Sequence, residues 1–368
     1  MNRQNLPNPA VTPILRLEKV SKKFEKSLDV AAKVANLFGA GIRQEIVHAV
    51  DAVSLDIYPG EVVGLVGESG CGKSTLGRMA VGLHGLNSGA RFWKGEDLDK
   101  MDTKQKHATR LAIQMIFQDP YASLNPRLRV SDIVGEAPVV HRLVGRAQKK
   151  EYVESKLELV GLDPLMIDRF PHQFSGGQRA RVGIARALAV NPEFLVCDEA
   201  VAALDVSIQA QVLNLFVSLR NRLNLTYLFI SHDLAVVRHL SDRVVIMYLG
   251  RVLESAASDQ IFSRANHPYT QALLASAPEL TTKKKVFVGV RGEIPSPLNP
   301  PSGCHFHPRC IHAMERCKTE RPPLLEVAPA HFSACHLNED AASSRMSRLV
   351  QIAPANDLRK KARTGAAS

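Results

Sequence analysis

A glycine-rich segment carries the first residues whose types and spacing could do chemistry. Residues 67–74 satisfy the pattern G-x-x-x-x-G-K-[S/T] of a phosphate-binding loop. Glycines let backbone N–H groups approach phosphate oxygens, the Lys73 ammonium can bind the β- and γ-phosphates, and the Ser74 hydroxyl can coordinate Mg²⁺. An ordinary strand-to-helix turn is the alternative, but it would not require the lysine. The residues expected to bind the nucleotide are Gly67, Glu68, Ser69, Gly70, Cys71, Gly72, Lys73, Ser74 and Thr75.

Two adjacent carboxylates follow a short apolar segment in the second half of the chain. Residues 194–197 are apolar and are followed by Asp198 and Glu199. A carboxylate at the tip of a buried strand can hold Mg²⁺ through water, and its neighbour can polarise an attacking water molecule. Two acids after a strand are weak evidence alone. After a phosphate-binding loop they predict hydrolysis, with Asp198 serving the metal and Glu199 the water.

These residues need a scaffold that brings strand ends together, and the apolar pattern predicts one. From residue 14 to about residue 280, short apolar runs alternate with amphipathic stretches, as in an α/β domain with a largely parallel sheet. Residues 120–172 are proline-rich and then charged and helical, which predicts an inserted helical subdomain. A short helix is expected within residues 266–280, and four prolines between 295 and 301 predict an irregular module after it.

The composition fits a globular protein with one large or two ordinary domains. The chain has 368 residues, of which 45% are hydrophobic, and a formal net charge of +11. No apolar run approaches the roughly 18–20 residues of a membrane-spanning helix, and residues 1–13 are polar and interrupted by proline, so a cytosolic protein is expected. The positive charge suits nucleic acid, nucleotide phosphates or an anionic membrane surface without choosing among them.

Four further segments resemble the motifs of the ABC ATPases, in the order in which that family has them. Residues 174–178, Phe-Ser-Gly-Gly-Gln, resemble its signature motif. Gln118 resembles the glutamine of the Q-loop, residues 203–205 resemble the D-loop, and His232 resembles the switch histidine. The resemblance covers about residues 14–336 and implies the P-loop NTPase fold.

The resemblance also implies that two ATPase subunits pair head to tail and share each active site. Lys73, Glu199 and His232 would be catalytic, with His232 on the γ-phosphate. The residues expected to hold Mg²⁺ are Ser74, Gln118 and Asp198, and Gln118 would relay closure of the site to a permease. The residues expected to contact the partner's ATP are Ser175, Gly176, Gly177, Gln178 and Asp205.

One expected contact and two departures from the family pattern concern the same site. In this family adenine usually stacks on an aromatic residue before the phosphate loop, and Phe24 occupies the matching position, displaced by an extra segment of roughly residues 25–47. A core phenylalanine is the alternative. Ala200 stands where the family usually has proline, and Phe174 stands where it has leucine. Neither departure removes a catalytic group, so a hydrolytically competent site is expected.

Two C-terminal segments resemble the extension of oligopeptide and dipeptide importer ATPases. They are residues 267–273, His-Pro-Tyr-Thr-Gln-Ala-Leu, and residues 292–297, Gly-Glu-Ile-Pro-Ser-Pro. This resemblance implies a bacterial importer subunit, peripheral on the cytoplasmic face of the inner membrane, with peptides as the default solute. Its partners would be two permeases, a second homologous ATPase or another copy of itself, and indirectly an extracytoplasmic substrate-binding protein.

Two other functional classes are disfavoured by the sequence. A soluble ABC ATPase acting on nucleic acid or ribosomes usually carries two ATPase domains or a long insertion, and this sequence has neither, so no nucleic acid partner is expected. A regulatory subunit that binds ATP without hydrolysing it conflicts with the complete set of Lys73, Asp198, Glu199 and His232.

Four of the six cysteines gather near the C-terminus. Cys304, Cys310, Cys317 and Cys335 lack the C-x₂₋₄-C knuckle of most zinc sites, and disulfides are not expected in a cytosolic chain. Four such thiolates fit a [4Fe–4S] cluster, a ligand set found in some members of the importer group that the chain resembles. Zinc with a nearby histidine, His307 or His336, and four unmetallated thiols remain alternatives. A metal would stabilise a small module that has little apolar sequence for a core.

The expected architecture is therefore α/β with three parts. A P-loop ABC ATPase domain spans residues 14–265, with its helical subdomain at about 120–172. A small irregular cysteine-containing module spans residues 266–337, and a polar, disordered tail spans residues 338–368.

Overall fold

The computed structural model describes residues 12–25, 45–119, 122–276 and 292–339, and two sheets form its scaffold. The larger sheet has the strand order β11-β12-β10-β9-β3-β8-β7-β6, and the smaller has the order β2-β1-β4-β5. The strands of the larger sheet are β3 (Val62–Val66), β6 (Ile113–Ile116), β7 (Phe194–Asp198), β8 (Thr226–Ile230), β9 (Arg243–Tyr248), β10 (Arg251–Ala257), β11 (Leu325–Ala328) and β12 (His331–Ser333). Those of the smaller sheet are β1 (Leu15–Glu25), β2 (Ile46–Ile57), β4 (Ser88–Trp93) and β5 (Glu96–Asp97).

The strands that lead to the predicted site form the parallel part of the larger sheet. β9, β3, β8, β7 and β6 pair in parallel, one beside the next. Every residue of β3, β7, β8 and β9 is buried. Strands covered on both faces are apolar throughout rather than alternating, which is why these segments could be predicted as short continuous runs. The predicted α/β class is confirmed.

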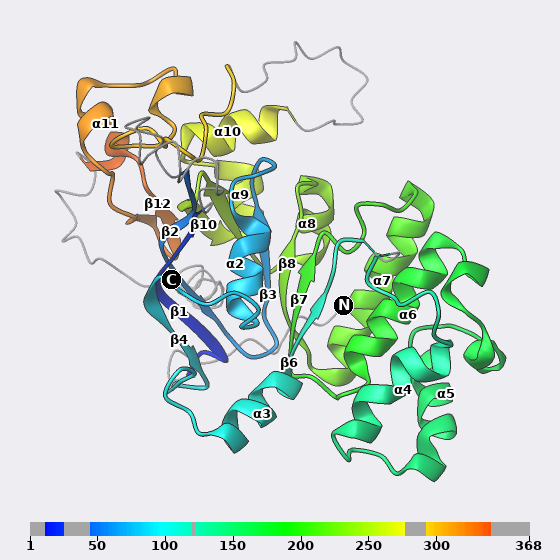
Figure 1. The fold of residues 1–368 in the computed structure, drawn as a ribbon. Helices are drawn as coiled ribbons and strands as arrows, with labels where there is room; N and C mark the ends of the chain where they lie inside the picture. The colour runs from blue at the N-terminus through cyan, green and yellow to red at the C-terminus, as the bar shows by residue number, and fades with distance from the viewer. Residues whose placement is uncertain (1–11, 26–44, 120–121, 277–291, 340–368) are drawn as a thin grey trace, which may run out of the picture.

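The helices follow the same alternation along the chain. They are α2 (Lys73–Ala80), α3 (Thr103–Ala112), α4 (Val130–Val140), α5 (Lys149–Leu159), α6 (Gly176–Leu188), α7 (Val206–Leu223), α8 (Leu234–Leu240), α9 (Ser258–Arg264), α10 (Pro268–Ala275) and α11 (Glu315–Thr319). Short 3₁₀ turns are η1 (Arg146–Gln148), η2 (Pro164–Asp168), η3 (Pro171–Gln173), η4 (His307–Arg309) and η5 (His336–Asn338). Figure 1 shows α2 between the two sheets, directly after β3.

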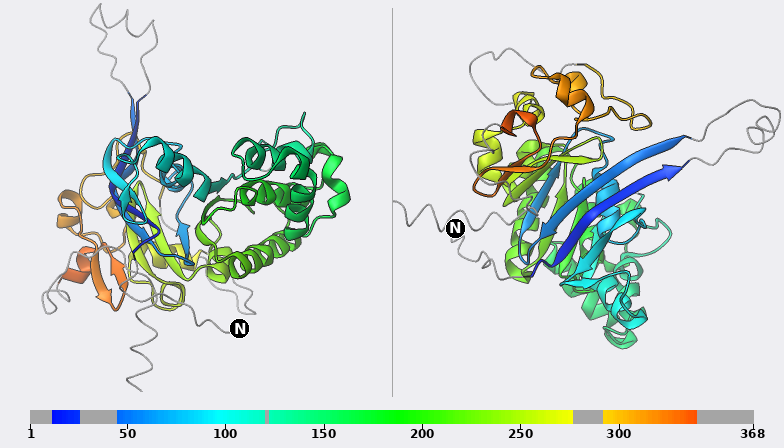
Figure 2. Two further views of the ribbon diagram at one scale, coloured as in Figure 1. Left: turned by 90° about the horizontal axis from the view of Figure 1, so that it is seen from below. Right: turned by 90° about the vertical axis from the view of Figure 1, so that its left-hand side faces the viewer.

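A helical lobe lies to one side of the sheets. Figure 1 shows α4, α5 and α6 together, away from the smaller sheet. Buried side chains such as Val134 of α4, Leu157 of α5 and Ile184 of α6 belong to one apolar core. In the left view of Figure 2 this lobe and the C-terminal segment lie on opposite sides of the sheets. Helices thus fill the predicted insertion, and its exact boundaries stay a prediction.

The C-terminal segment, which the structure describes at residues 266–276 and 292–339, extends the larger sheet. β12 pairs antiparallel with β10, and β11 pairs with β12. The sequence predicts an irregular module here, and the structure differs by these two strands, whose three and four residues are too few to show alternation. The predicted helix is present as α10. Asn338 is buried and exchanges side-chain amide hydrogen bonds with Asn266 (2.8 and 3.1 Å), so the ordered chain extends past the predicted start of the tail.

Two sequence-based expectations fall outside the described residues. The extra segment of residues 25–47 is described only at its ends, where β1 reaches Glu25 and β2 starts at Ile46. Most of the predicted tail, residues 340–368, also lies outside them.

Candidate nucleotide-hydrolysis site

The glycine-rich loop joins β3 to α2, as its sequence context predicts. Gly72 caps the helix with a φ of +102°, which favours glycine because L-residues with a side chain rarely adopt it. A Cβ on Gly67 would lie 2.1 Å from the carbonyl oxygen of Met247, so the loop packs directly against the end of β9. The Lys73 ammonium donates to the carbonyl oxygens of Gly67 (2.7 Å) and Glu68 (2.9 Å). The lysine predicted to be catalytic therefore lies within the curve of its own loop.

The predicted metal ligands Ser74 and Asp198 meet across the loop. The Ser74 hydroxyl donates to Asp198 Oδ1 at 2.7 Å, and Arg78 Nη2 lies 4.0 Å from Asp198 Oδ2. Burial raises the pKa of the Asp198 carboxyl, although the Ser74 hydrogen bond and the Arg78 charge oppose this. A hydroxyl beside a buried carboxylate is an all-oxygen donor set that suits Mg²⁺, which would supply charge neutralisation for phosphate oxygens. The sequence did not predict that Arg78 would lie beside Asp198, although its position one helical turn after Ser74 places it on the same face of α2.

Three predicted residues from three strand ends meet, with Gln118 and His232 both contacting the carboxylate of Glu199. Gln118 Nε2 donates to Glu199 Oε2 at 2.7 Å, and His232 Nδ1 lies 3.4 Å from Glu199 Oε1. They follow β6, β7 and β8, neighbouring parallel strands whose carboxyl ends share one edge of the sheet. Glu199 has a φ of +46°, a strained conformation for a non-glycine residue, and its N–H donates to the carbonyl of Ile230 (3.0 Å). The sheet thus holds the predicted catalytic carboxylate in a fixed place.

The signature residues start α6. Ser175 caps this helix, since its hydroxyl accepts from the Gln178 N–H (3.4 Å) while Gln178 Oε1 accepts from the Ser175 N–H (3.0 Å). A Cβ on Gly177 would lie 2.4 Å from Ile208 Cγ2, so α6 and α7 pack closely at this point. Asp205 caps α7 without a side-chain hydrogen bond. Figure 1 places α6 in the helical lobe and α2 between the sheets. The chain therefore does not bring its own signature motif to its own phosphate loop.

Phe24, the predicted adenine-stacking residue, lies at the end of β1. Its side chain is 38% exposed, so it is not a core phenylalanine. Its ring meets the His84 ring edge-on (centroids 5.4 Å apart), and Lys22 Nζ lies 5.2 Å from its centroid. The stacking role of this partly exposed ring stays a prediction.

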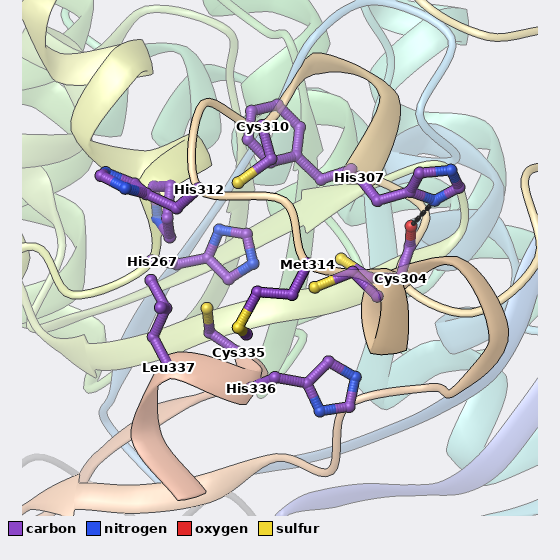
Figure 3. Close-up of a pocket in the computed structure, with 12 residues that line it drawn as sticks. His267, Cys304, His307, Cys310, His312, Met314, Cys335, His336 and Leu337 are labelled. Carbon is purple, nitrogen blue, oxygen red and sulfur yellow. Dashed lines mark hydrogen bonds between the residues drawn. The ribbon is translucent and has the colours of Figure 1, made fainter. Parts of the chain in front are cut away.

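The four clustered cysteines line one small pocket. Figure 3 shows them with surrounding histidines, and His267, His307, His312 and His336 also line the pocket. Burial raises the pKa of the Cys304 and Cys335 thiols to about 11, and neighbouring thiols add to this effect. In the ranges that the structure describes, no group of three or more histidine, cysteine or acidic side chains is arranged to hold a metal ion. The four predicted cluster ligands therefore line one pocket, but the described side chains are not arranged to coordinate a metal ion.

A phosphate loop between a buried strand and a helix, with acids and a histidine at neighbouring strand ends, defines a P-loop ATPase. Residues 50–202 match the family described as ABC transporter, and residues 253–317 match that described as oligopeptide/dipeptide transporter, C-terminal region. The oligopeptide transport ATP-binding protein AppF of Bacillus subtilis is 50% identical over 295 residues (79% of this chain, 90% of the relative). The corresponding protein OppF of Haemophilus influenzae is 46% identical over 316 residues (84% and 94%).

Two solved structures have the same fold. One is part of the ABC transporter complex cbiONQ from Clostridium perfringens, with a TM-score of 0.56 and 26% identity, covering 69% of this chain and 92% of that one. The other is a dimeric ATP-binding cassette bound to ADP and Pi, with a TM-score of 0.56 and 25% identity, covering 66% and 98%. The chain belongs to the ATP-binding subunits of ABC transporters, in the oligopeptide/dipeptide group, and is an ATPase. Within the described ranges, no helix is both long and apolar enough to cross a membrane.

Proposed function

We propose that this ATPase powers a bacterial importer of di- or oligopeptides by hydrolysing MgATP. The observation that carries the proposal is the convergence of Gln118, Glu199 and His232 at the sheet edge that also presents Asp198. The solute class is supported by the printed names of the relatives and by the match of residues 253–317 to the peptide-transporter C-terminal region. No comparison favours the nucleic acid alternative.

Within this proposal each residue has a separate role. Lys73 leaves its loop carbonyls for the β- and γ-phosphates, and Ser74, Asp198 and Gln118 serve Mg²⁺. Glu199 polarises the attacking water, and His232 contacts the γ-phosphate. Phe24 stacks on adenine, while main-chain N–H groups within residues 69–75 bind phosphate oxygens.

The signature residues serve a second subunit. α6 begins at the exposed cap residue Ser175, and Figure 1 shows this helix in the lobe, apart from the phosphate loop before α2. Ser175, Gly176, Gly177 and Gln178, with Asp205 at the seam, therefore contact the ATP held by a partner ATPase. The dimeric cassette among the solved relatives supports this arrangement. The partner is a second homologous ATPase or another copy of this chain.

The complete transporter places the chain peripherally on the cytoplasmic face of the inner membrane. Two permease subunits would receive the closure signal from Gln118 and the helical lobe, and an extracytoplasmic substrate-binding protein would deliver the solute. Support comes from the relatives, which are named as transport ATP-binding proteins.

The cysteine pocket is proposed to hold a [4Fe–4S] cluster with Cys304, Cys310, Cys317 and Cys335 as ligands. In such a cluster each thiolate binds a different iron, so four sulfurs around a pocket need not converge on one point. Anaerobically purified protein should contain iron and acid-labile sulfide. Cys310→Ser should lose both, whereas Cys197→Ala, which changes a buried cysteine of β7 outside the pocket, should keep them. Zinc in place of iron, or no metal, would reject the cluster.

Glu199→Gln tests the hydrolytic assignment. The variant should bind ATP as the native chain does and lose at least about a hundredfold in turnover, because an amide cannot take up a proton from water. Glu193→Gln is the matched control, since this half-exposed acid precedes the same strand and pairs with Lys94 (2.6 Å). ATPase activity should be measured with reconstituted permeases and substrate-binding protein, with and without peptide. Full activity in Glu199→Gln would refute the role, and stimulation by nucleic acid alone would refute the transport function.

A further inference from the structure

Glu68, the second residue of the phosphate loop, is held by the C-terminal segment. Arg309 donates to both of its carboxylate oxygens, from Nη1 to Oε2 at 2.7 Å and from Nη2 to Oε1 at 3.0 Å. The Arg309 side chain is 5% exposed and that of Glu68 is 22% exposed, so the pair is largely removed from water. Paired N–H···O bonds of this kind fix orientation as well as charge.

The main chain of Glu68 is held on both sides as well. Its N–H donates to the hydroxyl of Tyr269 (3.0 Å), and its carbonyl accepts from the Lys73 ammonium (2.9 Å). Tyr269 is fully buried in α10. The C-terminal segment thus supplies the partners of two of the three polar groups of Glu68, and the catalytic lysine supplies the third.

An aromatic cluster supports the guanidinium and the tyrosine hydroxyl. The Tyr248 and Tyr269 rings lie 4.8 Å apart, and the Phe306 ring lies 5.4 and 5.3 Å from them. The Arg309 guanidinium lies 5.8 Å from the Tyr248 ring centroid. Rigid packing around both donors means that Arg309 cannot follow Glu68 freely if the loop shifts.

The charge of Glu68 creates a problem that Arg309 solves. A carboxylate inside a loop that binds a triphosphate repels its own ligand, and burial strengthens that repulsion. A bidentate guanidinium neutralises the carboxylate and directs it away from the bound anion. Arg309 stands directly before Cys310 and ends η4, so this cation comes from the cysteine-containing segment.

We propose that Arg309 is a positioning residue for ATP binding, which neutralises Glu68 and holds the phosphate loop ready for the triphosphate, with Tyr269 fixing the same peptide. The proposal deepens the ATPase site and rests on ATP binding at this loop. It makes no assumption about the transported solute. The C-terminal segment is then part of the nucleotide site.

A double-mutant cycle in the full-length chain, in which the two charges are removed singly and together, distinguishes this role from a purely structural one. Arg309→Gln should raise the Kd for MgATP, followed by titration calorimetry, on the order of tenfold, because an uncompensated carboxylate then faces the phosphates. Glu68→Gln should tighten ATP binding, since the Arg309 charge is then no longer neutralised by a carboxylate while Tyr269 and Lys73 still hold the loop. Glu68→Gln/Arg309→Gln should return to within about threefold of the native Kd. Arg309→Lys, which keeps the charge, should recover most of the affinity.

The outcomes decide the proposal in each direction. In the assembled transporter, Arg309→Gln should raise KM for ATP with kcat changed less than about twofold, because binding rather than chemistry is affected. A double variant that binds ATP as weakly as Arg309→Gln alone would overturn the charge argument, as would native affinity in Arg309→Gln. If Arg309→Gln does not fold, two other variants still test the proposal. Glu68→Gln should bind MgATP more tightly than the native chain, and Tyr269→Phe should bind it more weakly. Loss of peptide transport with these shifts intact would count against the proposed solute only.

Discussion

A buried carboxylate in β10 joins the C-terminal segment to the ATPase sheet and offers a quantitative test of the fold. Glu254 is fully buried and accepts from the N–H groups of Asn266 (2.7 Å) and His267 (3.0 Å) and from His331 Nε2 (2.6 Å). These donors precede α10 and lie on β12, so one side chain connects three elements. Glu254→Gln removes the charge while keeping the shape.

The magnitude of the change follows from the donor count. One carboxylate oxygen becomes an NH₂ group, so one buried N–H donor loses its acceptor at a cost of about 1–3 kcal/mol. The two remaining bonds change from charge-assisted to neutral, which weakens each by about 1 kcal/mol. Burying an amide instead of a carboxylate offsets part of this loss. We expect a net destabilisation of about 3 kcal/mol at pH 7, measured by urea unfolding followed by circular dichroism.

The effect should also depend on pH in a defined direction. Burial acts to raise the pKa of Glu254, but the hydrogen bonds from His331 and the two N–H groups outweigh it, and the pKa lies below the usual 4.5. A lowered carboxyl pKa contributes stability above the unfolded value that is lost as pH falls through the folded value. The difference in the free energy of unfolding between the native chain and Glu254→Gln should thus narrow as the pH falls below about 4.5.

An exposed acid of the C-terminal segment provides the control. Glu315→Gln changes the same charge at a side chain that is 89% exposed, and should alter stability by less than about 0.5 kcal/mol. A loss below about 1 kcal/mol for Glu254→Gln, or a difference that does not narrow in acid, would refute the reasoning.

Two further predictions concern a close helix contact and a buried ion pair. Gly177→Ala should destabilise the chain by about 1–3 kcal/mol and reduce ATPase activity of the assembled transporter, because the new Cβ would meet Ile208. Gly183→Ala is the control, because this buried position of α6 has no neighbouring atom within 4 Å of the new Cβ. Its free energy of unfolding should rise by up to about 1 kcal/mol. Equal effects of the two variants in urea unfolding would contradict this reasoning. Arg243→Leu should cost about 3–5 kcal/mol in the same assay, since the fully buried Arg243 donates to Glu61 (2.7 and 3.0 Å) and its loss leaves a buried carboxylate unpaired, and a loss below about 1 kcal/mol would contradict this.

The parts of the fold and site that could be predicted are those determined by local sequence patterns. β7 could be predicted because full burial makes it a continuous apolar run, and its end then identifies Asp198 and Glu199. The meeting of Gln118, Glu199 and His232 follows from parallel strands, whose carboxyl ends share an edge. The family resemblance added the roles of these residues, which local physics alone does not assign.

The unpredicted parts are contacts between distant residues or strands too short to show a period. Glu68 and Arg309 are 241 positions apart, and no spacing rule connects a loop acid with an arginine that precedes a cysteine. β12 has three residues, fewer than a period-two pattern needs, and its place beside β10 depends on a buried acid, Glu254, that composition would assign to the surface.

These distant contacts change how the domain boundary proposed after residue 265 should be understood. The N–H of Ala334 donates to the Leu253 carbonyl (2.7 Å), Arg251 donates to the Gly303 carbonyl (2.7 Å), and Arg309 binds Glu68. Each bond crosses that boundary, and cutting the chain there would expose the edge of β10 and leave Glu68 beside the phosphates without its cation. An independent domain has few such contacts with its neighbour. The C-terminal segment therefore packs against both the ATPase sheet and its phosphate loop, while the predicted boundary after residue 265 stays a prediction.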